Sequence, residues 1–447
     1  MIVPSSRIMR LFAATVLPLS LASVMVPNGF ALLAGLLLLL CAIGGADAWL
    51  AERRRRGIDV EFPERLNLSC DRQAVLTFTV SDVSGAPRSL VIGLQLPNGV
   101  TSPYPEYPLQ LPGERQSIRG QWPLTASRRG SHLLGQCRLR VPSPLGLWYA
   151  QGSLPAGTRL RVYPNLAEER KRLAALFLNR NTALVRPARQ VGQGREFEKL
   201  RLYLPGDSIG DIHWRATAKR GQPVTKEFRI ERTQEVYVII DASRLSARQA
   251  APRSGEGSGE PLLERYIRSA LILGSVAQKQ GDLFGVMAFS DQVLGFVRAK
   301  SGTGHFGTCR DALLNLASAG VNPGYDEAAS FLAARLRRRA LLIFLTSLDE
   351  PALAEGFVRC IGVLGRRHLV CVAMQRPEAA APLFSGGEAT GLDDIYRSLG
   401  GHLVWHGLRE MKQTLRLAGV QLSLVEDERL SAEVVSRYLD VKRRQML

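Results

Sequence analysis

The stretch "EVYVIIDASRLS", residues 235–246, indicates the fold of the C-terminal half of the chain. Five consecutive apolar residues, 236–240, run directly into Asp241, and Ser243 and Ser246 follow. A short apolar run rich in β-branched residues is typical of a strand that is buried on both faces of a parallel sheet. Polar residues after such a strand lie at the carboxyl edge of the sheet, where open α/β folds bind ligands. The stretch therefore predicts a central strand that ends in a candidate site.

The rest of residues 232–447 alternates between apolar strands and helices. We expect further strands at 283–290, 293–299, 340–346 and 368–374, and helices at about 261–279, 306–318, 327–337, 351–364 and 431–445. This alternation predicts a Rossmann-like α/β domain with a mainly parallel sheet that helices cover on both faces. Ser347 and Asp349 follow the strand at 340–346, so we expect them at the same edge as Asp241.

The composition limits the classes of function. The chain has 447 residues, a length typical of two or three domains, and its formal net charge is +18. The basic residues are dispersed and no nucleic-acid-binding motif is present, so we expect no nucleic-acid partner, and the charge favours an anionic membrane surface. The six cysteines form no CxxC pair, and no GxxxxGK[ST] segment occurs. These absences argue against a zinc site and against a P-loop ATPase.

The N-terminus carries two uncharged apolar runs, 11–26 and 30–46. With their flanks, each run approaches the roughly 20 residues that cross a bilayer. Arginines precede the first run and follow the second, at 53–56, and positive flanks mark the cytoplasmic side. For residues 1–57 we therefore predict a two-helix transmembrane hairpin in the bacterial inner membrane, with both chain termini in the cytoplasm. A cleaved signal peptide is the alternative, but the second run would still stop transfer.

Residues 58–166 have the pattern of a β-rich domain. Segments at 72–83, 88–97, 130–142 and 158–166 are rich in β-branched residues, and Gly/Pro/Ser turns separate them. Short strands at this spacing predict a β-sandwich-like domain. No catalytic constellation is found there, so we interpret this domain as a spacer or an interaction module.

Residues 167–231 combine a linker helix, expected at 167–190, with a polar signature segment. Within that segment we expect Asp211 to cap a short helix, Trp214 on this helix to bury its ring, and Arg201 to pair with Asp207. The cluster is polar enough to form an enzyme site. A structural clamp is the simpler interpretation, because most clustered ion pairs are structural.

The signature segment carries a resemblance to a known family. Arg201, Tyr203, Gly206, Asp207, Ile212 and Trp214 match the pattern R-x-Y-x-x-G-D followed by I-x-W, and "SPLGLWYA" (143–150) matches a proline-leucine-glycine segment. On these motifs the chain, over nearly its whole length, resembles the domain of unknown function 58 family. Gly210 stands where that family commonly has arginine, so we assign no charge role there.

The resemblance implies a von Willebrand factor A-like (vWA-like) domain on a membrane anchor, acting with a MoxR-type AAA+ ATPase. It also implies that a set of signature residues serves interaction: Arg201, Tyr203, Gly206, Asp207, Asp211, His213 and Trp214.

The vWA resemblance raises the question of a metal site. The metal-ion-dependent adhesion site of vWA domains reads D-x-S-x-S, with a threonine on a second loop and an aspartate after a third strand. Asp241 and Ser243 match, but Leu245 replaces the second serine, and the second loop offers Tyr325 and Asp326. Magnesium requires an octahedral set of oxygen ligands. A rearranged site would draw on Asp241, Ser243, Asp326, Ser347 and Asp349.

We therefore predict a non-enzymatic, membrane-anchored scaffold without a cofactor, in which the degenerate site is a docking rim. Its partners would be inner-membrane lipids and an AAA+ ATPase, and its role the assembly or maturation of envelope or other protein complexes. Two alternatives stay open: a Mg²⁺-dependent vWA-type ligand-binding protein, and an enzyme that uses the 207–213 cluster. The oligomeric state is not predicted.

Overall fold

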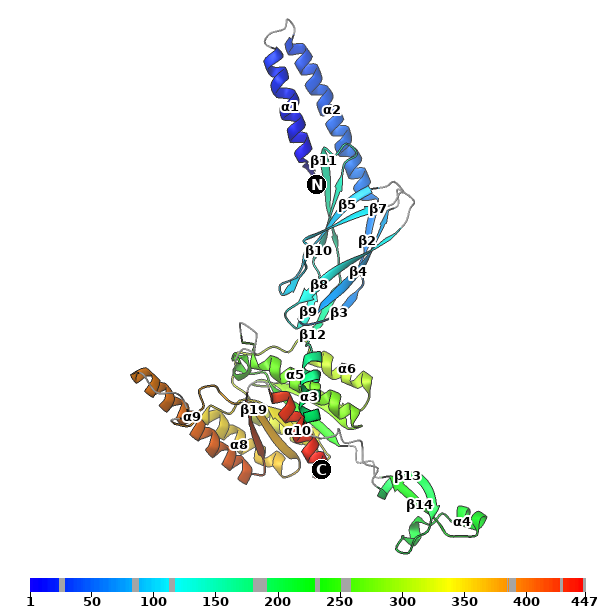
Figure 1. Cartoon of the computed structure of the whole chain (residues 1–447), viewed down its shortest axis with the longest axis vertical. Helices are drawn as coiled ribbons and strands as arrows, with labels where there is room; N and C mark the ends of the chain where they lie inside the picture. Colours follow the sequence, from blue (N-terminus) through cyan, green and yellow to red (C-terminus); the bar gives the residue numbers. More distant parts are fainter. Residues whose placement is uncertain are drawn as a thin grey trace. The chain divides into compact units, whose positions relative to one another are not determined.

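The computed structural model describes residues 1–23, 29–82, 88–111, 117–179, 191–229, 234–250, 259–383, 385, 391–426 and 429–444 (Figure 1). The chain divides into two compact units, Met1–Asn165 and Leu166–Leu447. We call them the N-terminal unit and the C-terminal unit.

The N-terminal unit begins with two helices, α1 (Ser6–Ser23) and α2 (Gly29–Arg56), which contact each other. Of the described residues, only those at 34–56 of α2 form a helix long and apolar enough to cross a membrane, with a mean hydropathy of 1.8. One apolar helix near the N-terminus, suited by length and composition to a membrane, is thus present.

Three sheets form the rest of the N-terminal unit. A five-stranded sheet has the order β1 (Ile2–Pro4), β11 (Trp148–Pro155), β10 (Gln136–Pro142), β5 (Arg88–Leu94), β7 (Glu106–Leu111). A four-stranded sheet has the order β2 (Ile58–Glu61), β4 (Gln73–Asp82), β8 (Ile118–Ala126), β6 (Val100–Thr101). A three-stranded sheet has the order β3 (Arg65–Ser69), β12 (Arg159–Tyr163), β9 (Gly130–Leu133).

One hydrophobic core joins these sheets. Leu76 and Phe78 of β4 and Leu90 and Ile92 of β5 alternate with outward-facing residues and are almost fully buried in it. The predicted sheet-rich middle region is therefore confirmed. The single strand expected at 130–142 is instead divided at Gly135, where an added Cβ would lie 3.0 Å from the carbonyl oxygen of Gln95, so β9 and β10 join different sheets.

The C-terminal unit is built on a six-stranded sheet with β15 at its centre. The order is β17 (Val293–Lys300), β16 (Leu283–Phe289), β15 (Glu235–Asp241), β18 (Leu341–Leu345), β19 (Leu369–Gln375), β20 (Gln421–Val425). All neighbouring pairs are parallel except β16 and β17, which form an antiparallel pair at the edge. The predicted mainly parallel sheet is present, and the residues at 236–240 are all 0% exposed.

Helices cover both faces of this sheet. α5 (Leu262–Lys279), α6 (Thr303–Ala312) and α10 (Leu430–Arg443) share one core with Val236, Val238 and Ile240 of β15. α7 (Tyr325–Arg335), α8 (Pro351–Gly365) and α9 (Leu392–Leu417) share the other core with Tyr237 and Ile239. The alternation of side chains along one strand thus sends neighbouring residues into different cores.

Two elements of the six-stranded sheet and its helical layers were not predicted from the sequence, α9 and β20. The buried residues of α9 are Gly401, Leu408 and Leu415, which are spaced seven apart along a largely polar helix. Such a narrow apolar stripe gives a weak helical signal.

In the sequence, the segment between β12 and β15 contains α3 (Ala167–Asn179) and a two-stranded antiparallel sheet of β13 (Val191–Leu202) and β14 (Val224–Arg229). Between these strands lie a short 3-10 turn at Ile209–Asp211 and α4 (Trp214–Arg220). The second half of the helix expected at 167–190 falls on residues 180–190, which lie outside the described residues.

Candidate functional site

Asp241 is the last residue of β15 and is 0% exposed. Its Oδ1 accepts a hydrogen bond from the backbone N–H of Ser243 at 2.8 Å, and its Oδ2 accepts one from the hydroxyl of Thr346 at 2.5 Å. Thr346 directly follows β18, the parallel neighbour of β15, so the carboxyl group joins the ends of two adjacent strands. Burial raises the pKa of Asp241, and the bonds from Thr346 and Ser243 oppose that shift only in part.

Two buried tyrosines extend this arrangement. The hydroxyl of Tyr325 lies 2.9 Å from Thr346 Oγ1, and that of Tyr266 lies 3.3 Å from Ser347 Oγ. Because Thr346 donates its proton to Asp241, Tyr325 donates to Thr346, and its hydroxyl also lies 3.4 Å from the carbonyl oxygen of Ser347. Burial raises the pKa of both tyrosines, so both stay neutral. We call Asp241, Thr346, Tyr325, Ser347 and Tyr266 the Asp241 network.

The two serines of the quoted stretch serve their own loop. Ser243 Oγ accepts from the backbone N–H of Leu245 at 3.3 Å and caps a short 3-10 helix, Arg244–Ala247. Ser246 Oγ donates to the carbonyl oxygen of Ser243 at 2.8 Å. Such local bonds from serine to backbone are typical of turns.

The predicted metal ligands are only partly brought together. Asp241 and Ser243 are adjacent, and Ser347 joins them through the Asp241 network. Asp349 instead pairs with Arg248 at 2.5 Å, and Asp326 on α7 accepts a hydrogen bond from Cys360 on α8. In the described part of the chain, no group of three or more His, Cys, Asp or Glu residues is placed to hold a metal ion.

These donors do not fit magnesium as they stand. Both oxygens of Asp241 already have protein donors, and the hydroxyls of Ser243 and Ser246 are engaged in the loop. A bound Mg²⁺ would require several of these bonds to be exchanged for metal–oxygen bonds.

A rim of ion pairs borders the Asp241 network. Arg244 binds Glu350 through two parallel bonds of 2.8 and 2.5 Å, and its Nε donates to Asn322 at 2.6 Å. Arg248 bridges Asp349 and Glu350. The bonds from Arg244 hold the pKa of Glu350 below its usual value, so this carboxylate is ionised at neutral pH.

Beside the rim lies a cleft of about 470 Å³, which we call the carboxyl-edge cleft. The residues that follow β15, β18 and β19 line it together with the start of α5: Arg248, Gln249, Ala250, Gly259, Leu262, Ser347, Asp349, Gln375, Arg376, Pro377, Glu378 and Ala379. Oδ1 of Asp349 is buried there and has no hydrogen-bond partner among the described residues. The cleft has the volume of a typical ligand pocket, and its lining combines charged, amide and apolar groups.

Sequence reasoning missed the roles of Thr346 and Tyr266. Thr346 ends the predicted strand at 340–346, and its position at a carboxyl edge was the available signal. Tyr266 lies within a helix and gives no local sign of its contact with Ser347.

In the signature segment, the predicted pair of Arg201 and Asp207 is present. Two bonds of 2.7 and 2.6 Å join the guanidinium to the carboxylate, which also accepts from the backbone N–H of Leu204 at 2.9 Å. The bond from Arg201, followed by that from Leu204, lowers the pKa of Asp207 to about 2. Gly206 has a φ of +108°, a conformation that favours glycine and turns the chain into this pair.

Two expectations about this segment are wrong. The residue that caps α4 is His213, whose Nδ1 accepts from the backbone N–H of Ala216 at 3.1 Å, whereas Asp211 belongs to the preceding 3-10 turn. The ring of Trp214 is not buried: this residue is 67% exposed. It starts a helix of seven residues, none of which is buried. Tyr203 contributes a backbone bond to Pro223.

The second motif of the resemblance, at 143–150, lies beside the apolar helices. The backbone N–H of Leu145 donates to Asp47 of α2 at 3.0 Å, and Ser5 Oγ donates to the carbonyl oxygen of Gly146. Gly146 has a φ of +71°, and an added Cβ would lie 2.9 Å from Nη1 of Arg7. This turn therefore holds the start of α1 and the middle of α2 in one place.

A comparison with protein-family models gives one matching family. Residues 199–386 match the model of a family described as "Protein of unknown function DUF58". A search of curated proteins gives no match.

Two solved structures illustrate the structural matches. A protein of unknown function from Porphyromonas gingivalis W83 is 18% identical, with 24% of this chain and 49% of that chain covered and a TM-score of 0.18. WR4, a C. elegans MSP family member, is 8% identical, with 24% and 97% covered and a TM-score of 0.16. The match thus spans about half the length of the first of these structures.

Proposed function

We propose that this chain, which residues 199–386 assign to the DUF58 family of proteins of unknown function, is a membrane-anchored, non-enzymatic adaptor. Two N-terminal spans fix it to the bacterial inner membrane, a β-sandwich-like spacer follows, and a vWA-like unit docks a protein partner. In this proposal the carboxyl-edge cleft is the docking site.

The carboxyl-edge cleft is the observation that carries the proposal. It lies at the edge of the sheet where open α/β folds bind ligands, and its volume of about 470 Å³ is within the range of ligand pockets. The charged side chains of its rim are paired with one another, although Oδ1 of Asp349 has no hydrogen-bond partner among the described residues. Asp241 is buried beneath Thr346, and the rim arginines bind Glu350 and Asp349. This arrangement supports recognition by a stable surface over chemistry by an activated group.

The family resemblance suggests the kind of partner. We propose a MoxR-type AAA+ ATPase, with which the adaptor would assist the assembly or maturation of envelope or other protein complexes. An adaptor of this kind needs no nucleotide site of its own, in agreement with the lack of a P-loop motif in the sequence.

Site-specific photo-crosslinking in intact cells tests this proposal. A photoreactive residue replaces Gln249, which is exposed in the carboxyl-edge cleft, and a matched control replaces Lys279, exposed at the end of α5. We expect an AAA+ ATPase to be crosslinked from position 249 and not from position 279. Equal crosslinking from both positions, or none from position 249, would contradict the proposal.

A further inference from the structure

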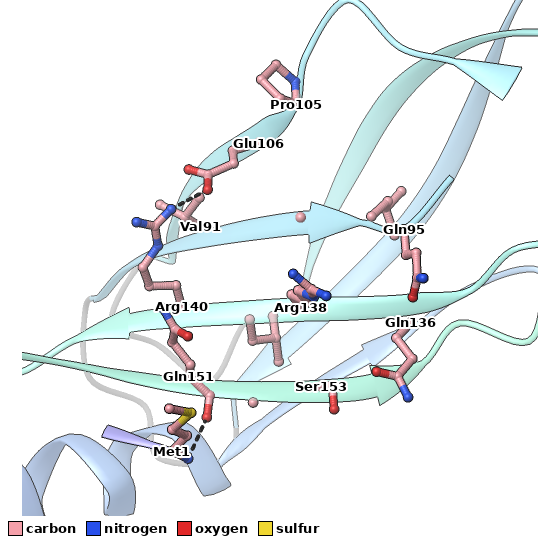
Figure 2. Close-up of a pocket in the computed structure, with 14 residues that line it drawn as sticks. Met1, Val91, Gln95, Pro105, Glu106, Gln136, Arg138, Arg140, Gln151 and Ser153 are labelled. Carbon is pink, nitrogen blue, oxygen red and sulfur yellow. Dashed lines mark hydrogen bonds and ion pairs between the residues drawn. The ribbon is translucent and has the colours of Figure 1, made fainter. Parts of the chain in front are cut away.

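A hollow of about 760 Å³ lies on the outer face of the five-stranded sheet in the N-terminal unit (Figure 2). Outward-facing residues of β5, β10 and β11 form its floor, and Met1 and Glu106 stand at its sides. The alternate residues of these strands, such as Ile92 and Leu139, enter the hydrophobic core on the other face. The hollow is therefore built on a rigid sheet and is open to its surroundings.

Arg138 lies at the centre of the hollow (Figure 2). The strand register places it between Gly93 of β5 and Ser153 of β11. Because glycine has no side chain and serine a short one, these two neighbours leave the side chain of Arg138 exposed. Arg138 is exposed and has no hydrogen-bond or ion-pair partner among the residues that the structure describes.

Two positive charges of the hollow have no ion-pair partner in the described part of the chain: Arg138, and the ammonium of Met1, which donates to the carbonyl oxygen of Gln151 at 3.0 Å. Arg140 forms an ion pair with Glu106, the acidic residue of the lining, and also lies over the ring of Tyr149. The other polar side chains of the lining are neutral: Gln95, Gln136, Gln151 and Ser153 (Figure 2). A free guanidinium among amide and hydroxyl donors is a typical setting for a phosphate group.

The hollow is level with the part of α2 that leaves the apolar segment. At Gly44 an added Cβ would lie 3.9 Å from Nε1 of Trp148, and at Gly152 it would lie 2.4 Å from Nη1 of Arg55. Residues 44–55 of α2 therefore run alongside residues 148–152 of β11.

Interfacial side chains occupy this part of the unit. Trp49 is 61% exposed and Leu145 is 57% exposed. The guanidinium of Arg53 lies 5.6 Å from the centre of the Trp49 ring. Exposed tryptophan beside arginine is typical of the headgroup level of a bilayer. Ser153, the register partner of Arg138, follows Gly152, which lies against Arg55, so Arg138 is level with the basic end of α2 that follows Trp49.

We propose that Arg138 and the amides around it bind the phosphate of an anionic phospholipid in the leaflet next to the sheet. The lipid would reach the hollow from the bilayer in which α2 is anchored, so this inference rests on the membrane anchoring of the proposed function. Charge supports the choice of an anionic lipid: exposed Arg7, Arg10, Arg53 and Arg56 surround the same end of the unit.

Lipid binding to the full-length protein in mild detergent tests the inference. Native mass spectrometry measures the affinity for phosphatidylglycerol and for phosphatidylcholine. We expect phosphatidylglycerol to bind more tightly and Arg138→Gln to weaken it about fivefold, the usual effect of one arginine near an anionic lipid surface. The control Arg119→Gln, an exposed arginine on β8, should leave the affinity unchanged.

A second variant acts in the opposite direction. Glu106→Gln releases Arg140 from its ion pair and should tighten binding of phosphatidylglycerol. Equal affinity of wild type and Arg138→Gln, or no effect of Glu106→Gln, would overturn the inference. Soluble glycerol phosphate or an acidic peptide that binds as tightly as the lipid would also overturn it, because the ligand would then not come from the membrane.

Flotation with vesicles separates this inference from the anchoring itself. A protein that fails to float with phosphatidylcholine vesicles contradicts the proposed anchoring. A protein that floats but does not prefer phosphatidylglycerol contradicts the lipid site alone.

Discussion

Asp241 in the C-terminal unit and Asp47 in the N-terminal unit are both buried, at 0% and 2% exposure, but their carboxyl groups have different partners. Both oxygens of Asp241 accept hydrogen bonds, from Ser243 and from Thr346. Only Oδ1 of Asp47 does so, from Leu145, and its Oδ2 has no partner among the described residues. Trp148 of β11, whose indole lies near Gly44 of α2, has an N–H that is likewise buried and without a partner in the described part of the chain.

The hydrogen bonding of the Asp241 carboxyl group is complete within the protein, and that of the Asp47 carboxyl group is not complete among the described residues. Asp241 is a structural junction between two strands, and its hydrogen-bonding capacity is used within the fold. Asp47 and Trp148 retain a buried acceptor and a buried donor without a partner among the described residues. Asp241, which the sequence pattern predicts as a metal ligand, is thus the aspartate whose two oxygens both have hydrogen-bond donors within the protein.

Asp241→Ala has the largest expected effect. It leaves the backbone N–H of Ser243 and the hydroxyl of Thr346 without an acceptor in a buried site, at about 1–3 kcal/mol each. We expect the C-terminal unit to lose about 3 kcal/mol of unfolding free energy, measured by urea unfolding with pulse proteolysis. Wild-type stability in this variant would mean that Asp241 is not a junction.

Thr346→Val tests the same junction from the other side. It removes the hydroxyl that donates to Asp241 and accepts from Tyr325, while it keeps the shape of the side chain. The expected loss is about 2 kcal/mol of unfolding free energy. Thr346→Ser keeps the hydroxyl and is the matched control, so a loss as large as that of valine would show that packing, and not the hydrogen bond, is at stake.

The pH dependence of stability reports the burial of Asp241. Its pKa is raised in the folded state, so its contribution is fully present below the ordinary pKa of an aspartate and is lost as pH rises through the raised value. Wild type should therefore lose stability relative to Asp241→Asn over that window. Urea midpoints at a series of pH values measure the difference, and parallel curves for the two proteins would contradict the assigned shift.

Asp47→Asn should change little. The asparagine oxygen still accepts from Leu145, and its amide occupies the side that has no partner, so we expect a change below about 1 kcal/mol. Asp47→Ala removes the acceptor and should speed hydrogen exchange of the Leu145 amide. If Asp47→Asn accelerates that exchange as much as Asp47→Ala, the second oxygen has a partner and the comparison fails.

A third aspartate, Asp207, gives the smallest effect because its pair is partly solvated. Arg201→Gln should return the pKa of Asp207 from about 2 towards its model-compound value of 3.8, as measured by NMR titration. The stabilisation from this pair is present above the unfolded-state pKa and is lost as pH falls through the folded value of about 2. An unchanged pKa in the variant would assign the shift to the backbone of Leu204.

The sequence predicted the sheet of the C-terminal unit well, because a strand buried on both faces must be apolar along its length. It also placed Asp241, Ser347 and Asp349 near the carboxyl edge. It did not predict their partners, because the bonds from Thr346, Tyr266 and Arg248 join residues that lie far apart in the chain. The exposure of Trp214 was missed for a related reason, since a ring is buried only when another element packs on it.

Photo-crosslinking from position 249, repeated with and without a Mg²⁺ chelator, tests the central claim most directly. If the carboxyl-edge cleft docks the partner while Asp241 is a closed junction, an AAA+ ATPase should be crosslinked equally well in both conditions. A crosslink that disappears on chelation would contradict this account and favour a rearranged metal site at Asp241 and Ser243.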